Sequence, residues 1–336
     1  MRLGICAAVA VLLGSLAAVA HVDATPIPPS FEIYSIGVNG AGIRNLTHSP
    51  LDEGSPAVSP NGRKIAFVRT TAGNRDLWVM NADGSGQRQL TSSTAEDESE
   101  PVWSPNGALI AFTAGTRDAC LPSPCPRWSV RVVRPDGTGL RDVVAYARAG
   151  RWSPNGRKLV LETDIDPYQE AESISVADLA GGVRKIVDAG VVANPVWSRD
   201  GRIAFVLQGS GLYVARADGT ARRRIAADAE EPDWSPTGRQ IAFLTLNRVN
   251  VVAGSGGRAK RIALADGFAW SRSGRRLALF REQGRIAVIK PNGRSFRVVE
   301  RVRGRLDASW LGPWTWSRDG KRLFYAARVE QSPPPG

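Results

Sequence analysis

The chain has 336 residues, of which 43% are hydrophobic and 23% charged, so it can bury a large core and is not compositionally disordered. Ten tryptophans and 35 glycines are typical of many tight turns around repeated aromatic anchors, which favours β structure. The chain has two histidines, His21 and His48, which argues against a Ser-His-Asp triad or a multi-histidine metal centre.

The N-terminus has the pattern of an export signal. Arg2 is followed by the uncharged, mostly apolar run 3–20 and then by small residues, with cleavage expected after Ala20 or Ala24. An uncleaved anchor helix is the alternative, because eighteen residues just reach spanning length. Both interpretations place the rest of the chain outside the cytoplasm, in the periplasm or envelope or as a secreted protein.

Two cysteines remain after removal of the signal, Cys120 and Cys125, and they lie close together in one segment. Because exported proteins meet an oxidising environment, we expect a local disulfide between them. Two reduced thiols are the alternative. Zinc is a weaker interpretation, since the chain offers no second cysteine pair and no nearby histidine.

A tryptophan box, Trp-Ser-Pro-Asn-Gly followed by an apolar run, recurs seven times. Its serines are 45, 49, 45, 37, 36 and 46 residues apart, and valine replaces tryptophan in the first copy. Asn-Gly and Asp-Gly pairs tolerate positive φ, so each box is expected to close a hairpin with a two-residue turn. The boxes begin at Val58, Trp103, Trp152, Trp197, Trp234, Trp270 and Trp316.

A second hairpin follows each of the first six boxes, and one unaccompanied copy, with the turn Asn39-Gly40, lies near the start. Four short strands per repeat, with one unit split between the chain ends, predict an all-β, seven-bladed β-propeller. Residues near 31–48 would pair with the C-terminal blade and close the ring. Six blades is the alternative, if the Val58 copy or the end near Leu311 forms no full blade. We expect one domain over 25–330 and a disordered tail over 331–336.

Two segments of the repeat have a distinctive amino-acid sequence. Residues 100–107 read Glu-Pro-Val-Trp-Ser-Pro-Asn-Gly, and residues 79–86 read Val-Met-Asn-Ala-Asp-Gly-Ser-Gly. Over about residues 31–330 the chain resembles the TolB-like, WD-repeat-like β-propeller family. The resemblance implies an extracytoplasmic binding propeller, and the matching residues are structural ones.

Charge is distributed unevenly along the chain. Residues 1–219 contain 21 Lys plus Arg and 22 Asp plus Glu, whereas residues 220–336 contain 23 and 10. This predicts a basic arc over blades 5–7 that attracts a protein or an anionic envelope component, or that associates with a membrane surface. Export argues against nucleic acid as the partner. The plainer interpretation is a set of solvated arginine-rich turns.

The connection 300–314 combines spaced arginines with tryptophans, the residue types most enriched at binding hot spots. It would lie among the longer connections, which share one face of a propeller and usually carry the binding residues. Alternatively, the tryptophans pack this connection onto the ring. The predicted binding residues are Arg301, Arg303, Arg305, Trp310 and Trp314.

Two acidic segments, 96–100 and 164–172, lie in expected connections. The second has Gln169 and Ser175 where a calcium-binding EF-hand loop needs glycine and glutamate, so we expect solvated acidic loops without a metal. No cofactor-binding or nucleophile motif supports an enzyme. The function expected is a non-catalytic exported binding scaffold, and the alternative is a carbohydrate-active enzyme that uses a pair of loop carboxylates.

Overall fold

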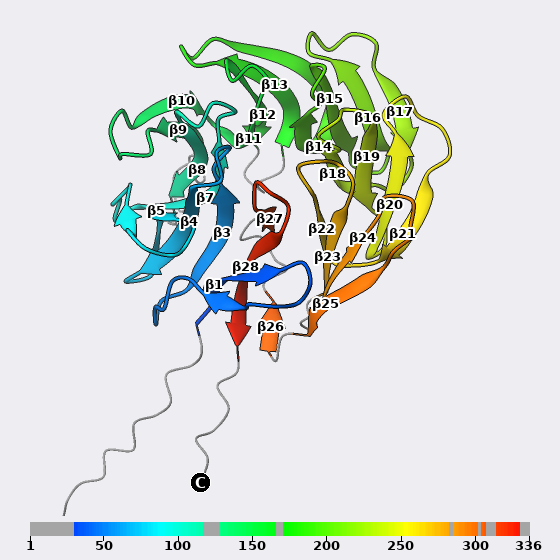
Figure 1. Cartoon of the computed structure of the whole chain (residues 1–336). Helices are drawn as coiled ribbons and strands as arrows, with labels where there is room; N and C mark the ends of the chain where they lie inside the picture. Colours follow the sequence, from blue (N-terminus) through cyan, green and yellow to red (C-terminus); the bar gives the residue numbers. More distant parts are fainter. Residues whose placement is uncertain are drawn as a thin grey trace, which may run out of the picture.

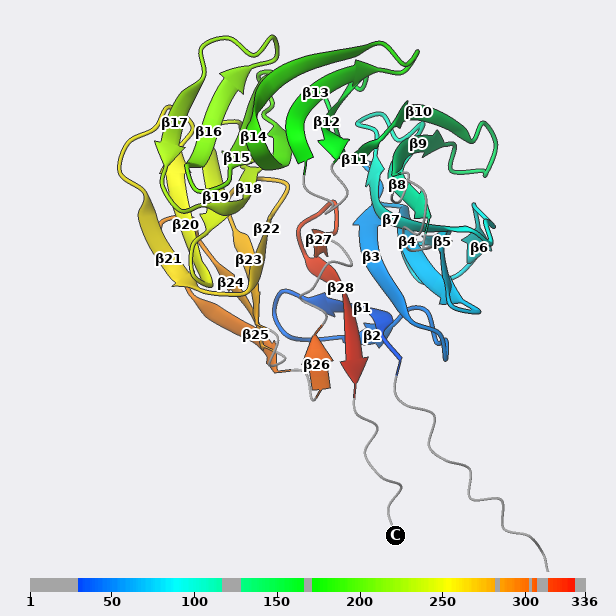
Figure 2. The same ribbon diagram turned by 180° about the vertical axis from the view of Figure 1, so that it is seen from behind.

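The computed structural model describes residues 30–116, 128–165, 171–281, 285–301, 304–306 and 314–329. Every regular element within these ranges is a β-strand. The strands form antiparallel sheets that stand side by side around a ring, which Figure 1 and Figure 2 show from opposite sides. The chain is a seven-bladed β-propeller, as the repeat predicts.

Four blades are separate four-stranded sheets, and in each the strand that carries the tryptophan box is at one edge. Blade 1 contains β3 (Glu53–Val58), β4 (Lys64–Thr71), β5 (Asn74–Asn81) and β6 (Arg88–Gln89). Blade 2 contains β7 (Glu96–Trp103), β8 (Ile110–Thr116), β9 (Ser129–Val133) and β10 (Arg141–Ala145). Blade 5 contains β18 (Glu230–Trp234), β19 (Gln240–Leu244), β20 (Arg248–Ala253) and β21 (Lys260–Leu264). Blade 6 contains β22 (Gly267–Trp270), β23 (Leu277–Arg281), β24 (Arg285–Ile289) and β25 (Arg297–Arg301).

Blades 3 and 4 share one strand and so form a continuous seven-stranded sheet. The shared strand is β14 (Val183–Trp197), which pairs with blade 3 through its first half and with blade 4 through its second. Blade 3 also contains β11 (Ala147–Trp152), β12 (Lys158–Ile165) and β13 (Ala171–Asp178). Blade 4 also contains β15 (Arg202–Leu207), β16 (Gly211–Arg216) and β17 (Arg223–Ala226).

Blade 7 closes the ring by joining the two ends of the chain. β1 (Glu32–Gly37) pairs with β28 (Arg322–Val329) from Glu32–Ala327 to Gly37–Arg322, and β2 (Arg44–Asn45) follows outside β1. β26 (Gly304–Leu306) and β27 (Thr315–Trp316) both pair with β28 on its other side. The predicted closure is therefore confirmed, and neither the Val58 copy nor the C-terminal end reduces the ring to six blades.

The hydrophobic core lies between neighbouring blades. The buried side chains form seven clusters, and each cluster combines residues of two adjacent blades. Four of the six box tryptophans also join the blades by a hydrogen bond, in which the indole Nε1 donates to the carbonyl that precedes the box residue of the blade before, whereas the indoles of Trp197 and Trp234 have no partner among the described residues. Trp103 donates to Ala57 (2.8 Å), Trp152 to Val102 (3.0 Å), Trp270 to Asp233 (3.2 Å) and Trp316 to Ala269 (3.1 Å).

The box turns are longer than the two residues predicted. Ser59 N donates to Lys64 O, so four residues lie between the paired ends, and Gly62 N donates back to Ser59 O. Gly62 alone has positive φ, at 75°, whereas a two-residue type I′ turn needs positive φ at both central residues. The Ser59 hydroxyl donates to Asn61 and accepts from Lys64 N, which fixes the longer turn.

Antiparallel pairing sorts the connections onto two faces. The box turns and the second turns of all blades lie on one face, which we call the turn face. The connections in the middle of each blade and between blades lie on the other, the loop face. This division agrees with the sequence-based expectation.

Candidate functional site

A cavity of about 520 Å³ opens on the loop face between blades 4 and 5. Its lining includes three buried apolar residues, Val192, Leu207 and Ala229, which are 1%, 8% and 4% exposed. Charged side chains line it as well: Arg148 from β11, Asp228 from the connection into β18, and Glu230 at the start of β18. An apolar pocket with a few convergent polar groups is the usual form of a binding site.

Leu246 forms a lip of this cavity and is the most exposed large apolar residue among those described, at 89%. It lies in the hairpin between β19 and β20, where Thr245 and Arg248 exchange two backbone hydrogen bonds of 3.0 Å. Only two residues therefore close the turn, and both have positive φ, 47° for Leu246 and 54° for Asn247. Such turns favour Asn and Gly, so a leucine here is strained as well as exposed.

Left-handed backbone recurs around the cavity. Asn194 (φ 53°), Asp228 (φ 45°) and Glu231 (φ 47°) join Leu246 in this conformation. Asn194 and Glu231 lie at register shifts of β14 and β18, and each precedes a proline. A following proline disfavours the right-handed helical region, and at these two bulges the backbone is left-handed. The same left-handed bulge before a proline recurs at Ser55 (φ 53°) and Glu100 (φ 52°) in blades 1 and 2, so it belongs to the repeat, and the strained turn at Leu246 is the feature particular to this cavity.

A buried carboxylate positions the wall of the cavity. Glu162, 4% exposed, accepts a hydrogen bond from Arg148 Nε through Oε2 (2.8 Å) and from the backbone N of Asn194 through Oε1 (2.7 Å). One side chain of blade 3 thus fixes both the guanidinium and the bulge of blade 4. The wall is held in place before any ligand arrives, which lowers the cost of binding.

Charged residues of the box-bearing strands interact across the centre of the ring. Arg151 of blade 3 lowers the pKa of both Glu100 in blade 2 and Asp233 in blade 5, while desolvation, the larger effect, raises both. Asp233 remains accessible to water, yet the surrounding protein raises its pKa to about 6. The centre of the ring therefore holds acids and a base from three blades.

The acidic segment 96–100 is not a solvated loop, contrary to expectation, because it belongs to β7. Glu96 forms an ion pair with Arg131 (2.5 Å) and Asp97 with Arg75 (3.2 Å). Glu98 is 1% exposed, and burial together with the neighbouring Asp76 carboxylate raises its pKa to about 8. These acids join strands and blades instead of facing solvent.

The second acidic segment, 164–172, connects β12 and β13, and Asp164 pairs with Lys185 at 2.7 Å. Residues 166–170 lie outside the described ranges. Among the described residues, no three His, Cys, Asp or Glu side chains are grouped so that they could hold a metal ion.

The predicted binding residues fall in different places. Trp314 is 4% exposed and stacks between Phe280 (4.0 Å between ring centres) and Tyr325 (4.8 Å), so it packs blade 6 against blade 7 and does not face a partner. Arg301 ends β25 and Arg305 lies in β26. Arg303 and Trp310 lie outside the described residues, as do Cys120, Cys125 and the export signal. Partner contacts by the three arginines stay a prediction.

Comparisons with known proteins agree with the ring. A family model for the lipoprotein LpqB β-propeller domain matches residues 44–145. The chain is 38% identical over 68 residues to the Tol-Pal system protein TolB of Rhizorhabdus wittichii, a match that covers 20% of this chain and 15% of that protein. The fold is also similar to a TolB-assigned structure from Agrobacterium tumefaciens, with a TM-score of 0.56 and 18% identity over 90% of this chain and 99% of that one.

The chain therefore resembles the TolB-like β-propellers. It spans between 9% and 28% of the length of the curated relatives it matches. An oligogalacturonate lyase in complex with manganese is similar too, with a TM-score of 0.64 and 15% identity over 90% of this chain and 97% of that one. At these identities, the structural likeness shows the fold alone.

The cavity of this TolB-like propeller was missed at the level of the sequence. Its lining comes from five separate stretches of the chain, which meet only when blades 3, 4 and 5 pack. One signal was available: the apolar run 241–244 and the valine-rich segment 249–252 leave room for a tight turn whose centre is Leu246-Asn247. In the described ranges no helix has the length and apolarity to cross a membrane.

Proposed function

We propose that this TolB-like propeller is a binding protein without catalytic activity, and that it holds an extended segment of a partner protein in the loop-face cavity between blades 4 and 5. The observation that carries the proposal is Leu246, an apolar side chain kept 89% exposed in a strained turn at the edge of an apolar cavity. Folding alone gives no reason for that choice, whereas a partner that covers the leucine does.

The chemistry of the cavity indicates the kind of segment. The buried side chains of Val192, Leu207 and Ala229 suit one apolar side chain of the partner. Asp228 and Glu230 at the rim outnumber Arg148, whose charge is already paired with Glu162. A partner segment with an apolar residue beside a lysine or arginine therefore fits best.

The setting of this interaction is the cell envelope. The matched relatives are described as Tol-Pal system proteins and the matched domain as part of a lipoprotein, which suggests an envelope location. The export signal predicted over 1–24 agrees with it. The partner would accordingly be another envelope protein, for which TolB-like relatives give coarse support.

The experiment is capture of partners from an envelope extract by the immobilised protein, with Leu246→Asn as the test variant. Asparagine suits the turn, so the fold is retained while the apolar contact is lost. Leu264→Asn is the matched control, since Leu264 ends β21 of the same blade, is 49% exposed and does not line the cavity. Proteins captured by the wild type and by Leu264→Asn should be lost with Leu246→Asn. Equal capture by all three forms would contradict the proposal.

One observation favours a carbohydrate-active enzyme as the second candidate. Asp233 is accessible within the ring and has a pKa of about 6, which suits a general acid near neutral pH. The wild type would then cleave oligosaccharides, and the variant Asp233→Asn would not. If the wild type releases no product from such substrates, the enzyme candidate is wrong and the binding function is the one that remains.

A further inference from the structure

The turn face is strongly basic. The seven box turns, at 59–64, 104–109, 153–158, 198–202, 235–240, 271–276 and 317–322, contain thirteen lysines or arginines and two aspartates. The second turns, at 81–88, 134–141, 178–184, 216–224, 253–261 and 290–297, contain fourteen lysines or arginines and four aspartates. The positive charge of the chain is therefore concentrated on one face, in addition to the arc that the sequence predicts.

Arginine replaces a turn-forming proline at three equivalent positions of this face. The residue after the box serine is proline in four blades, but it is Arg199, Arg272 and Arg318 in blades 4, 6 and 7. The turn keeps its shape without the proline, because Gly201, Gly274 and Gly320 still donate to the box serines. Proline at a compatible position stabilises a fold by about 0.4–1 kcal/mol. Arg272 has a structural use, because it donates to Ser59 O and Pro60 O of the box turn of blade 1 at 3.0 Å each.

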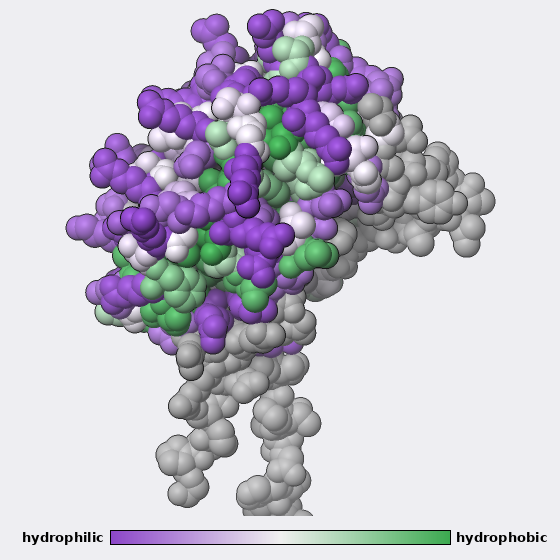
Figure 3. All heavy atoms as spheres, turned by 90° about the vertical axis from the view of Figure 1, so that its right-hand side faces the viewer, coloured by the Kyte–Doolittle hydropathy of each residue, from purple (hydrophilic) through white to green (hydrophobic). Residues whose placement is uncertain are grey.

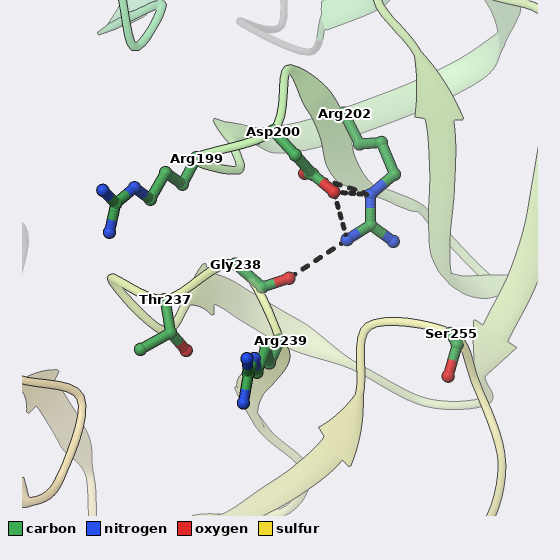
Figure 4. Close-up of a pocket in the computed structure, with 7 residues that line it drawn as sticks. All are labelled: Arg199, Asp200, Arg202, Thr237, Gly238, Arg239 and Ser255. Carbon is green, nitrogen blue, oxygen red and sulfur yellow. Dashed lines mark hydrogen bonds and ion pairs between the residues drawn. The ribbon is translucent and has the colours of Figure 1, made fainter.

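A hollow of about 510 Å³ lies among these arginines, between the box turns of blades 4 and 5. Figure 4 shows Arg202 held by Asp200 and by the carbonyl of Gly238, at 2.9 and 3.0 Å, with its guanidinium also over the ring of Trp234. Arg199 and Arg239 also line the hollow and are exposed, and neither side chain has a hydrogen bond or ion pair with another described residue. Two free guanidinium groups beside an open hollow suit a phosphate group.

Apolar side chains stand beside arginines at the rim of the same face. Ile43, Leu140, Val183 and Phe296 follow the second turns of blades 7, 2, 3 and 6 and are 47–51% exposed. Each is followed directly by an arginine. Three of those arginines are fixed, because Arg141, Arg184 and Arg297 donate to turn carbonyls of the next blade, Leu179, Asp218 and Asn39.

We propose that the turn face docks flat on an anionic membrane surface. Its free arginines would contact lipid phosphates, and its apolar rim residues would enter the headgroup region. The short turns of all blades end together on this face, so it matches a planar partner better than a narrow one. Figure 3, which looks onto the outer strands of blades 4 and 5, shows hydrophilic side chains projecting from that side with apolar patches between them. The segment of a partner protein that binds in the loop-face cavity would then lie on the side of the ring that faces away from the membrane.

The test is co-sedimentation of the full chain with vesicles of phosphatidylcholine, with and without phosphatidylglycerol. Binding is expected only with phosphatidylglycerol. The variant R199Q/R239Q should weaken it about tenfold or more at 0.1 M salt, because each basic residue adds to the attraction. The variant I43S/L140S/F296S should remove the part of the binding that survives high salt, which screens charge but not apolar contacts.

The controls carry the same changes on the loop-face side. R248Q/R285Q removes two arginines near the loops of blades 5 and 6, and L264S removes an apolar side chain of 49% exposure. Both should bind as the wild type does, and since all forms share residues 1–30, any contribution of that segment cancels. Equal loss in controls and test variants would overturn the proposal, as would absence of a phosphatidylglycerol requirement. Displacement by soluble polyphosphate, with normal binding by the apolar variant, would make the ligand a soluble polyanion and overturn it as well.

Discussion

Leu246 has a backbone conformation that asparagine or glycine adopts at lower cost. Left-handed φ costs an ordinary side chain on the order of 1 kcal/mol, and Leu246 has φ 47° with its side chain in solvent. Leu246→Asn is therefore expected to raise the free energy of unfolding by about 1 kcal/mol while it weakens partner binding. Urea unfolding of the two forms measures the first effect. A destabilised variant would show that the leucine supports the fold.

Glu98 is a buried acid whose titration should appear in the pH dependence of stability. Burial and the Asp76 carboxylate raise its pKa to about 8, above its value in the unfolded chain. The folded protein thus keeps a proton that the unfolded chain releases, so stability is full at low pH and is lost as pH rises toward 8. Glu98→Gln, which stays neutral, should flatten the decline of stability between pH 5 and pH 8. Unfolding curves at several pH values compare the slopes, and an unchanged slope would contradict this assignment.

At the scale of the strand and turn, the sequence predicts most of the hairpins. It does not predict features that depend on the adjacent strand or blade. The boxes place the first hairpin of every blade, because the box serine and the polar residue two positions later fix each turn through local hydrogen bonds. The bulges at Asn194 and Glu231 were not predicted, since a register shift depends on the partner strand. For Trp314 the sequence leaves partner binding and packing onto the ring both open, because its position between Phe280 and Tyr325 arises only when blades 6 and 7 meet.

The box tryptophans offer a matched pair of variants for the hydrogen bonds between blades. Trp152 donates to Val102 O, whereas the indole of Trp234 has no hydrogen-bond partner, and the two are 7% and 4% exposed. Trp152→Phe should destabilise the protein by about 1 kcal/mol more than Trp234→Phe, because only the first loses a hydrogen bond between blades. Thermal unfolding of the two variants gives the difference. Equal losses would mean that packing alone accounts for both residues.

For the whole molecule, the ring depends on strands from both chain ends. β1 supplies the strand between β28 and β2, so without residues 31–47 blade 7 would lose two strands and expose an edge. Deletion of 31–47 is expected to unfold the protein, with loss of the cooperative thermal transition. A deletion variant that melts like the wild type would contradict closure of the ring.

The two faces of the ring have separate roles in this account, with a partner protein at the loop face and a charged surface at the turn face. A photoreactive amino acid at position 246 tests the central assignment most directly, with the same group at position 296 on the turn face as the comparison. After irradiation in an envelope preparation, a discrete protein adduct is expected from position 246 and none from position 296. A protein adduct from position 296 alone, or none from position 246, would contradict partner binding in the cavity between blades 4 and 5.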